Sequence, residues 1–316
     1  MSALEPASPN VRFTVPASHT VVDLKMSDGA IIRVRRHGNP EGVRLVLSHG
    51  NGFAIDAYYP FWRQFLTGHD VILYDQRNHG WNPTHHRSGH TIARMAEDME
   101  AVLSAVTAGF GARSTIGIFH SLSTLAGLVH YMQNGPRWDA LVLVDLPLTP
   151  PPGHRLHELA RDFEIVLRDW ALQRTKHFSS PHELAVYFKR TRRARRWVAG
   201  AADLMAQAIT RPAAEGGYEL VCPPAFESQI FGESSGPITW SVKGFSAPNL
   251  FVVSSDYLAP DADPQGKVCE AMAVEFGIPV VRIPETGHLL QIERPEFVAQ
   301  VVREYLYSLN LDRSKS

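Results

Sequence analysis

Residues 117–127 read G-I-F-H-S-L-S-T-L-A-G. The apolar run before Ser121 is typical of a buried strand, and a run with helical periodicity begins directly after it. A nucleophilic serine is exposed at this kind of sharp strand-to-helix turn. The usual glycines two places on either side are replaced by Phe119 and Ser123. Because a serine needs a base to take its proton, the stretch predicts a nucleophile only if partners exist elsewhere in the chain.

The rest of the chain alternates short β-branched runs with helical periods, which predicts parallel strands joined by crossover helices. Most of these runs are continuously apolar, as expected of strands covered on both faces. The expected strands are 21–25 and 31–35, as an edge hairpin, and then 44–48, 71–74, 115–119, 141–144, 249–253 and 280–283. The expected helices are 58–66, 92–108, 122–133, 265–276 and 295–309.

One segment breaks this alternation. Residues 149–245 hold several helical stretches and no convincing buried strand, which indicates a mainly helical insertion. After the C-terminal end of a strand, an insertion of this size would cover the crevice where open α/β sheets bind ligands. We therefore expect a core of residues 11–148 and 246–312, a cap of residues 149–245, and a frayed tail of residues 1–10.

Polar motifs follow the later strands and supply candidate partners for Ser121. Asp256 comes just after the expected strand 249–253, in V-V-S-S-D-Y-L-A-P. His288 lies in a glycine-led loop after the last strand, in P-E-T-G-H-L-L-Q. The order Ser…Asp…His at the carboxyl ends of strands predicts a nucleophile, an orienting acid and a base at one edge of the sheet.

Together these segments resemble the α/β-hydrolase superfamily, in its lid-bearing branch. The matching motifs are S-H-G-N-G-F, D-Q-R-N-H-G, H-S-L-S, S-D-Y-L-A-P and G-H-L-L-Q-I-E-R-P-E-F-V, and they extend over nearly the whole chain. The resemblance implies an α/β fold with a mostly parallel eight-stranded sheet flanked by helices and a helical cap inserted after strand six.

The resemblance also implies a mechanism, in which His288 removes the proton of Ser121 and Asp256 holds the imidazole. Asp145, after the strand 141–144, is an alternative orienter, because some relatives take the acid from that strand end. The oxyanion hole would be made by the amides of Leu122 and Asn51.

The expected substrate site surrounds these residues. Small-molecule sites are mostly apolar. We expect Phe53, Leu258 and Leu289 to form apolar wall, and Trp170 of the cap to add aromatic surface. His120, directly before the serine, is expected to be structural or to contact the substrate.

The composition excludes several classes of function. A net charge of −1 gives no overall basic field, so we expect no nucleic-acid partner. Cys222 and Cys269 are too few for a disulfide framework. The histidines near residue 85 lack a recognisable metal spacing, so we expect no metal and no cofactor. The first residues lack a secretory pattern, and no apolar run is long enough to span a membrane, so we expect a cytoplasmic protein. We expect a monomer or a homodimer. The basic run 189–196 is expected to be a solvated face, with contact to an anionic substrate as the alternative.

We therefore expect a serine hydrolase with a triad, resembling carboxylesterases. It would cleave an ester, lactone or amide bond of a small, largely hydrophobic molecule through an acyl-enzyme. The alternative is other chemistry on the same fold, such as C–C bond hydrolysis, a lyase reaction or cofactor-independent dioxygenation. A non-catalytic binding protein on this fold is the third hypothesis.

Overall fold

The computed structural model describes residues 11–233, 240, 249–254 and 264–311. Within this part of the chain, eight strands form one sheet in the order β1-β2-β4-β3-β5-β6-β10-β11. The strands are β1 (Thr20–Lys25), β2 (Ile31–Gly38), β3 (Val43–Ser48), β4 (His69–Tyr74), β5 (Thr115–His120), β6 (Ala140–Val144), β10 (Asn249–Ser254) and β11 (Val280–Ile283). Only the pairings β1–β2 and β2–β4 are antiparallel. The predicted mostly parallel eight-stranded fold is therefore confirmed.

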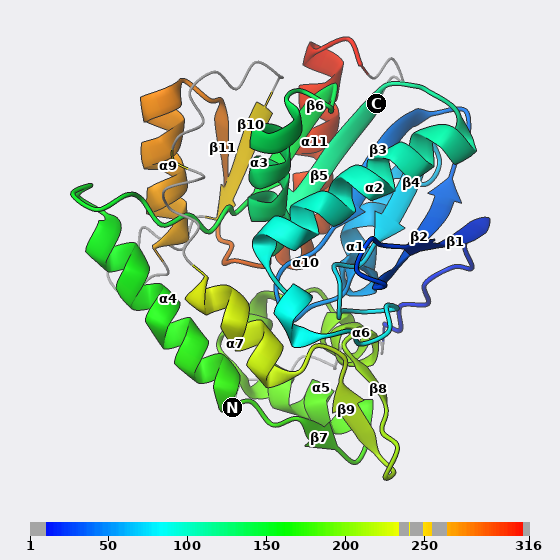
Figure 1. Ribbon diagram of the computed structural model, residues 1–316, viewed down its shortest axis with the longest axis vertical. Helices are drawn as coiled ribbons and strands as arrows, with labels where there is room; N and C mark the ends of the chain where they lie inside the picture. The colour runs from blue at the N-terminus through cyan, green and yellow to red at the C-terminus, as the bar shows by residue number, and fades with distance from the viewer. Residues whose placement is uncertain (1–10, 234–239, 241–248, 255–263, 312–316) are drawn as a thin grey trace, which may run out of the picture.

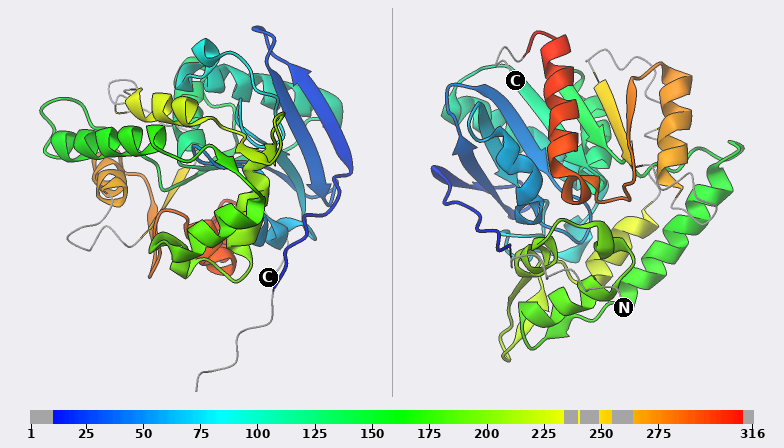
Figure 2. Two further views of the ribbon diagram at one scale, coloured as in Figure 1. Left: turned by 90° about the horizontal axis from the view of Figure 1, so that it is seen from below. Right: turned by 180° about the vertical axis from the view of Figure 1, so that it is seen from behind.

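Helices cover both faces of this sheet (Figures 1 and 2). The longer core helices are α2 (Ile92–Phe110), α3 (Leu122–Asn134), α9 (Gln265–Phe276) and α11 (Pro295–Ser308). Shorter pieces are η1 (Ile55–Tyr58), α1 (Tyr59–Trp62), η2 (Arg63–Phe65), η3 (Arg87–Gly89) and α10 (Leu290–Glu293). One buried apolar cluster joins the sheet to α2, α3 and α9, and a second joins the other face to α1 and α11. This two-faced burial explains why the strand sequences are continuously apolar.

The described residues between β6 and β10 lie beyond one end of the sheet, and we call this segment the cap (Figure 1). Its described elements are α4 (His157–Leu172), β7 (His177–Phe178), α5 (Pro181–Arg190), η4 (Arg193–Arg196), α6 (Ala201–Ala208), β8 (Thr210–Pro212), β9 (Tyr218–Leu220) and α7 (Pro224–Gly232). This segment is mostly helical, and it also holds a small antiparallel sheet in the order β7-β9-β8. None of the helices in the described ranges is both long and apolar enough to cross a membrane.

Candidate active site

Ser121 stands at the turn between β5 and α3 with backbone angles φ 51° and ψ −117°. A positive φ is unfavourable for a residue with a side chain and persists only where the surroundings enforce it. The Ser121 amide donates to the Val144 carbonyl at 3.0 Å, which ties the turn to the neighbouring strand β6. The buried Ser123 hydroxyl accepts from the His120 amide and donates to the His120 carbonyl, each at 2.9 Å. Ser123 therefore braces the turn, whereas Ser121 faces the cavity described below.

Phe119, the unexpected large residue beneath this turn, is fully buried. Two glycines make room for its ring. A Cβ on Gly117 would lie 2.5 Å from its Cε2, and a Cβ on Gly127 would lie 3.3 Å from its Cδ2. The ring also packs edge-on against Trp138, with the centroids 5.3 Å apart. The large side chain at position 119 therefore fits beneath the turn because Gly117 in β5 and Gly127 in α3 have no side chains at its ring.

His288 lies in the loop after β11, where its Nε2 is 3.0 Å from the Ser121 Oγ. Glu293 holds this loop, because its carboxylate accepts the Gly287 amide at 2.7 Å. The structure therefore brings the predicted nucleophile and the predicted base into hydrogen-bonding contact, although 167 positions separate them in sequence.

The acid that contacts His288 is Asp145, directly after β6. Its Oδ2 accepts from the His288 Nδ1 at 2.6 Å, and its Oδ1 accepts from the Ser254 amide at 2.9 Å. Asp145 has a positive φ of 47°, and its own amide donates to the Val252 carbonyl. The sequence pattern favoured Asp256 as the orienting acid, with Asp145 as the alternative. Asp256 lies outside the described residues, and the carboxylate that contacts the imidazole is that of Asp145.

The amides of Asn51 and Leu122 belong to residues that flank Ser121 in the cavity. The backbone amides of the two residues next to Asn51 already have acceptors. The Gly52 amide donates to the His79 Nε2 at 3.0 Å, and the Gly50 amide donates to the Tyr58 hydroxyl at 3.3 Å. Among the described residues, no hydrogen-bond acceptor is matched to the Asn51 or Leu122 amide. Two such amides beside a serine hydroxyl can donate hydrogen bonds to a developing oxyanion.

His120 is fully buried and does not line the cavity. Its Nε2 donates to the His288 carbonyl at 2.8 Å, so its Nδ1 accepts from the Tyr58 hydroxyl at 2.8 Å. Burial, helped by the nearby His288, lowers the pKa of His120 far below its usual value, which keeps the ring neutral. His120 therefore supports the base from behind, and the expectation that it contacts the substrate does not fit this position.

A cavity of about 670 Å³ opens at Ser121 and His288 between core and cap. Phe53, Leu289 and Trp170 line it as expected, while Leu258 lies outside the described residues. Further apolar wall comes from α4 and α7, and the lining there includes Phe163, Leu167, Ile230 and Phe231. This is room for a drug-sized or smaller organic molecule.

Charged residues on the cavity wall were not singled out as site residues in the sequence. Arg192, Arg193 and Arg196 of the basic run are exposed, as expected of a solvated face, and they also line the cavity. Arg174 and Glu227, two more lining residues, form an ion pair. The density of arginines in residues 189–196 was the available signal, but spacing alone does not reveal which of them face inward.

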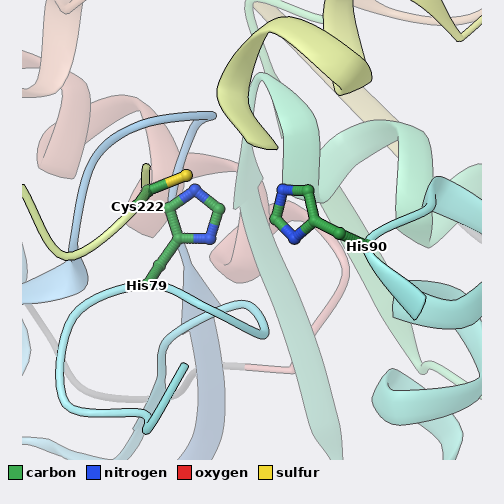
Figure 3. A group of neighbouring side chains, drawn as sticks. All are labelled: His79, His90 and Cys222. Atoms are coloured by element: carbon green, nitrogen blue, oxygen red, sulfur yellow. The ribbon is translucent and has the colours of Figure 1, made fainter. Parts of the chain in front are cut away.

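His79, His90 and Cys222 form a buried group whose possible ligand atoms all lie within 4.8 Å of one another (Figure 3). The His79 Nδ1 donates to the Arg77 carbonyl at 2.9 Å, and its Nε2 accepts the Gly52 amide. The His90 Nδ1 accepts from the Asn78 side-chain amide at 3.0 Å, which leaves its Nε2 protonated. Neither ring offers a free lone pair, so this donor set does not fit a metal ion, and we assign it to bracing the Gly52 loop.

Comparisons with known proteins identify the family of the chain. A family model described as "Alpha/beta hydrolase family" matches residues 45–301. The putative carbamate hydrolase RutD of Variovorax paradoxus (strain S110) is 34% identical over 110 residues. This match covers 34% of the present chain and 40% of that protein, so the chain matches less than half the length of this curated relative.

Solved structures share the fold. The crystal structure of E-2-(acetamidomethylene)succinate hydrolase superimposes with a TM-score of 0.73 at 16% identity, covering 91% of this chain and 99% of that one. The esterase RhEst1 from Rhodococcus sp. ECU1013 superimposes with a TM-score of 0.69 at 18% identity, covering 92% and 99%. At these identities the likeness extends to the fold and not to the substrate.

Proposed function

Because the chain belongs to the alpha/beta hydrolase family, we propose that it is a serine hydrolase. It cleaves an ester, lactone or amide of a small organic molecule through an acyl-enzyme. The observation that carries the proposal is the hydrogen-bonded series Ser121–His288–Asp145, with 3.0 Å from the Ser121 Oγ to the His288 Nε2 and 2.6 Å from the His288 Nδ1 to the Asp145 Oδ2.

In the first half-reaction the Ser121 Oγ attacks the carbonyl carbon while its proton passes to the His288 Nε2. The two amides of Asn51 and Leu122 hold the carbonyl oxygen as its negative charge grows. Asp145 keeps the proton on the His288 Nδ1 and stabilises the imidazolium. The leaving group then departs with the proton from Nε2, which leaves the acyl group on Ser121.

In the second half-reaction a water molecule loses its proton to the His288 Nε2 and attacks the acyl carbon. The acid product leaves as Ser121 regains its proton. The cycle involves no oxidation or reduction, and water is its only co-substrate. The cavity between cap and core holds the acyl and leaving groups against apolar wall.

The test is turnover of a panel of short-chain 4-nitrophenyl esters by the purified full-length protein. We expect a presteady-state burst of nitrophenol from the wild type, because the acyl-enzyme accumulates in such mechanisms. Ser121→Ala should remove the burst and lower kcat by about 10⁴-fold or more. Ser123→Ala is the matched control, because the Ser123 hydroxyl bonds to the His120 backbone and does not line the cavity. This variant should retain the burst. A burst that survives in Ser121→Ala refutes the proposal.

A further inference from the structure

Arg174 follows helix α4 and extends its side chain into the wall of the cavity that holds Ser121 and His288. The side chain is 11% exposed. Its guanidinium lies over the Trp170 ring, 5.2 Å from the centroid, and its Nη1 donates to the Glu227 carboxylate on α7. The aromatic face and the carboxylate fix the orientation of the cation, which is how a preorganised binding group is built.

This cation is close to the proposed oxyanion hole. A Cβ on Gly52 would lie 3.0 Å from the Arg174 Nη1 and 2.5 Å from the Glu227 Oε1. The Asn51 side chain also donates to the Glu227 carbonyl at 2.9 Å. The Arg174–Glu227 pair therefore packs directly on residues 51 and 52, next to the place where a scissile carbonyl would bind.

One edge of the guanidinium remains available. Within the described part of the chain, only Nη1 of Arg174 has a hydrogen-bond acceptor, which leaves Nε and Nη2 without one. These two nitrogens form the planar fork that binds a carboxylate through two parallel hydrogen bonds. Arg174 can thus hold Glu227 on one side and a ligand carboxylate on the other.

Further charged residues line the same space. Three are arginines, Arg192, Arg193 and Arg196, and three are glutamates, Glu164, Glu233 and Glu293. Burial raises the pKa of Glu164 and Glu233, so a negative charge on these two groups is less favourable than in water. Arginines stay charged at all physiological pH values, so the cavity keeps cationic groups that attract an anion.

We propose that the substrate carries a carboxylate close to its scissile carbonyl and that Arg174 binds this carboxylate. The substrate class is then a monoester or monoamide of a short dicarboxylic acid. The inference rests on the proposed function for its chemistry, but the binding of the carboxylate can be measured without it.

The first experiment compares 4-nitrophenyl hydrogen glutarate with its neutral counterpart, the 4-nitrophenyl methyl diester of glutarate. We expect the wild type to show a kcat/KM at least tenfold higher for the acid ester. Arg174→Gln should lower the ratio of the two kcat/KM values at least tenfold, and Arg174→Lys should lower it less, because lysine keeps the charge but loses the fork. Arg195→Gln is the matched control, since Arg195 is exposed and does not line the cavity.

Arg174→Gln leaves Glu227 buried without its partner and could reduce folding. The double variant Arg174→Gln/Glu227→Gln avoids this and should show the same loss of the ratio. Glu227→Gln alone keeps the cation and removes a competing carboxylate, so it should retain the preference for the acid ester.

The second experiment measures glutarate binding to Ser121→Ala by calorimetry, with and without Arg174→Gln. Binding that requires Arg174 supports the inference even if no ester is cleaved, in which case only the proposed function fails. Hydrolysis of neutral esters without any preference for the acid ester, and without glutarate binding, overturns the inference and leaves the hydrolase proposal standing. Inorganic phosphate that binds more tightly than glutarate would also overturn the assignment to a carboxylate.

Discussion

The Asp145 carboxylate has a defined orientation because each oxygen has its own donor. The Ser254 amide holds Oδ1, and the His288 Nδ1 donates to Oδ2. A carboxylate that accepts a hydrogen bond from Nδ1–H keeps the proton on Nδ1, so Nε2 is free to take the serine proton. The tautomer that the proposed chemistry needs is therefore set by the loop after β6.

Asp145→Asn keeps the size of the side chain but offers an amide where His288 needs an acceptor. We expect kcat to fall by about 10³- to 10⁴-fold, because the imidazole is then held in the wrong tautomer. Asp256→Asn, measured beside it in the same ester assay, should lose far less. A larger loss in Asp256→Asn than in Asp145→Asn would show that the orienting acid is Asp256.

At this scale the sequence predicted Ser121 and His288 from their positions after strands, and the structure brings the two together. It favoured Asp256 over Asp145 as the orienting acid, although both follow strands whose ends are expected at the same edge of the sheet. The ranking depends on which loop approaches the imidazole, and that is a three-dimensional property. The role of Arg174 was equally hidden, because its partner Glu227 is 53 positions away.

At the scale of elements, the contact of β5 with α3 decides whether the serine turn can form above Phe119. Gly117 and Gly127 line the space that the ring fills, and Trp138 closes it. The large residue is tolerated because two small residues compensate for it, which is how cores keep their total volume.

Gly117→Ala should therefore destabilise the protein by about 1–3 kcal/mol, because its methyl group would overlap the Phe119 ring. The double variant Gly117→Ala/Phe119→Leu should recover part of this loss. Gly109→Ala is the control, since a Cβ there meets nothing within 4 Å. Urea denaturation measures all three, and an unchanged midpoint for Gly117→Ala would contradict the described packing.

The sequence located the sheet strands to within two residues, except that β2 extends three residues further than expected, and it was less successful with short elements. The expected helix 58–66 is broken into η1, α1 and η2, and Pro60 lies in the first turn of α1. Proline fits the first turn of a helix, where no amide proton is needed, so it favours a new start at α1 over a continuation of η1. The cap strands β7, β8 and β9 were missed because two or three residues are too few to show an alternating pattern.

At the scale of the whole molecule, buried neutral histidines couple folding to pH. His37 in β2 is 2% exposed, and its ring lies 5.2 Å from that of Trp62. Burial, with smaller contributions from Arg35 and His19, lowers the pKa of His37 to about 4 from 6.5. The unfolded chain thus binds a proton at His37 between these pH values, and the folded protein does not.

The free energy of unfolding should consequently fall as the pH drops through this window, with His37 contributing about 2 kcal/mol of the loss by pH 5. His37→Gln removes this contribution, so its stability should decline less than that of the wild type between pH 7 and pH 5. Guanidinium denaturation across this range is the measurement. Parallel curves for the two proteins would mean that His37 has the same pKa in the folded and unfolded states.

The central claim is that Ser121 is a nucleophile activated by His288. A fluorophosphonate probe reacts with activated serines, and mass spectrometry of the labelled peptides identifies the modified residue. The account predicts one adduct, on Ser121, which disappears in Ser121→Ala and forms far more slowly in His288→Ala. An adduct on Ser123, or no adduct on a folded protein, would contradict it.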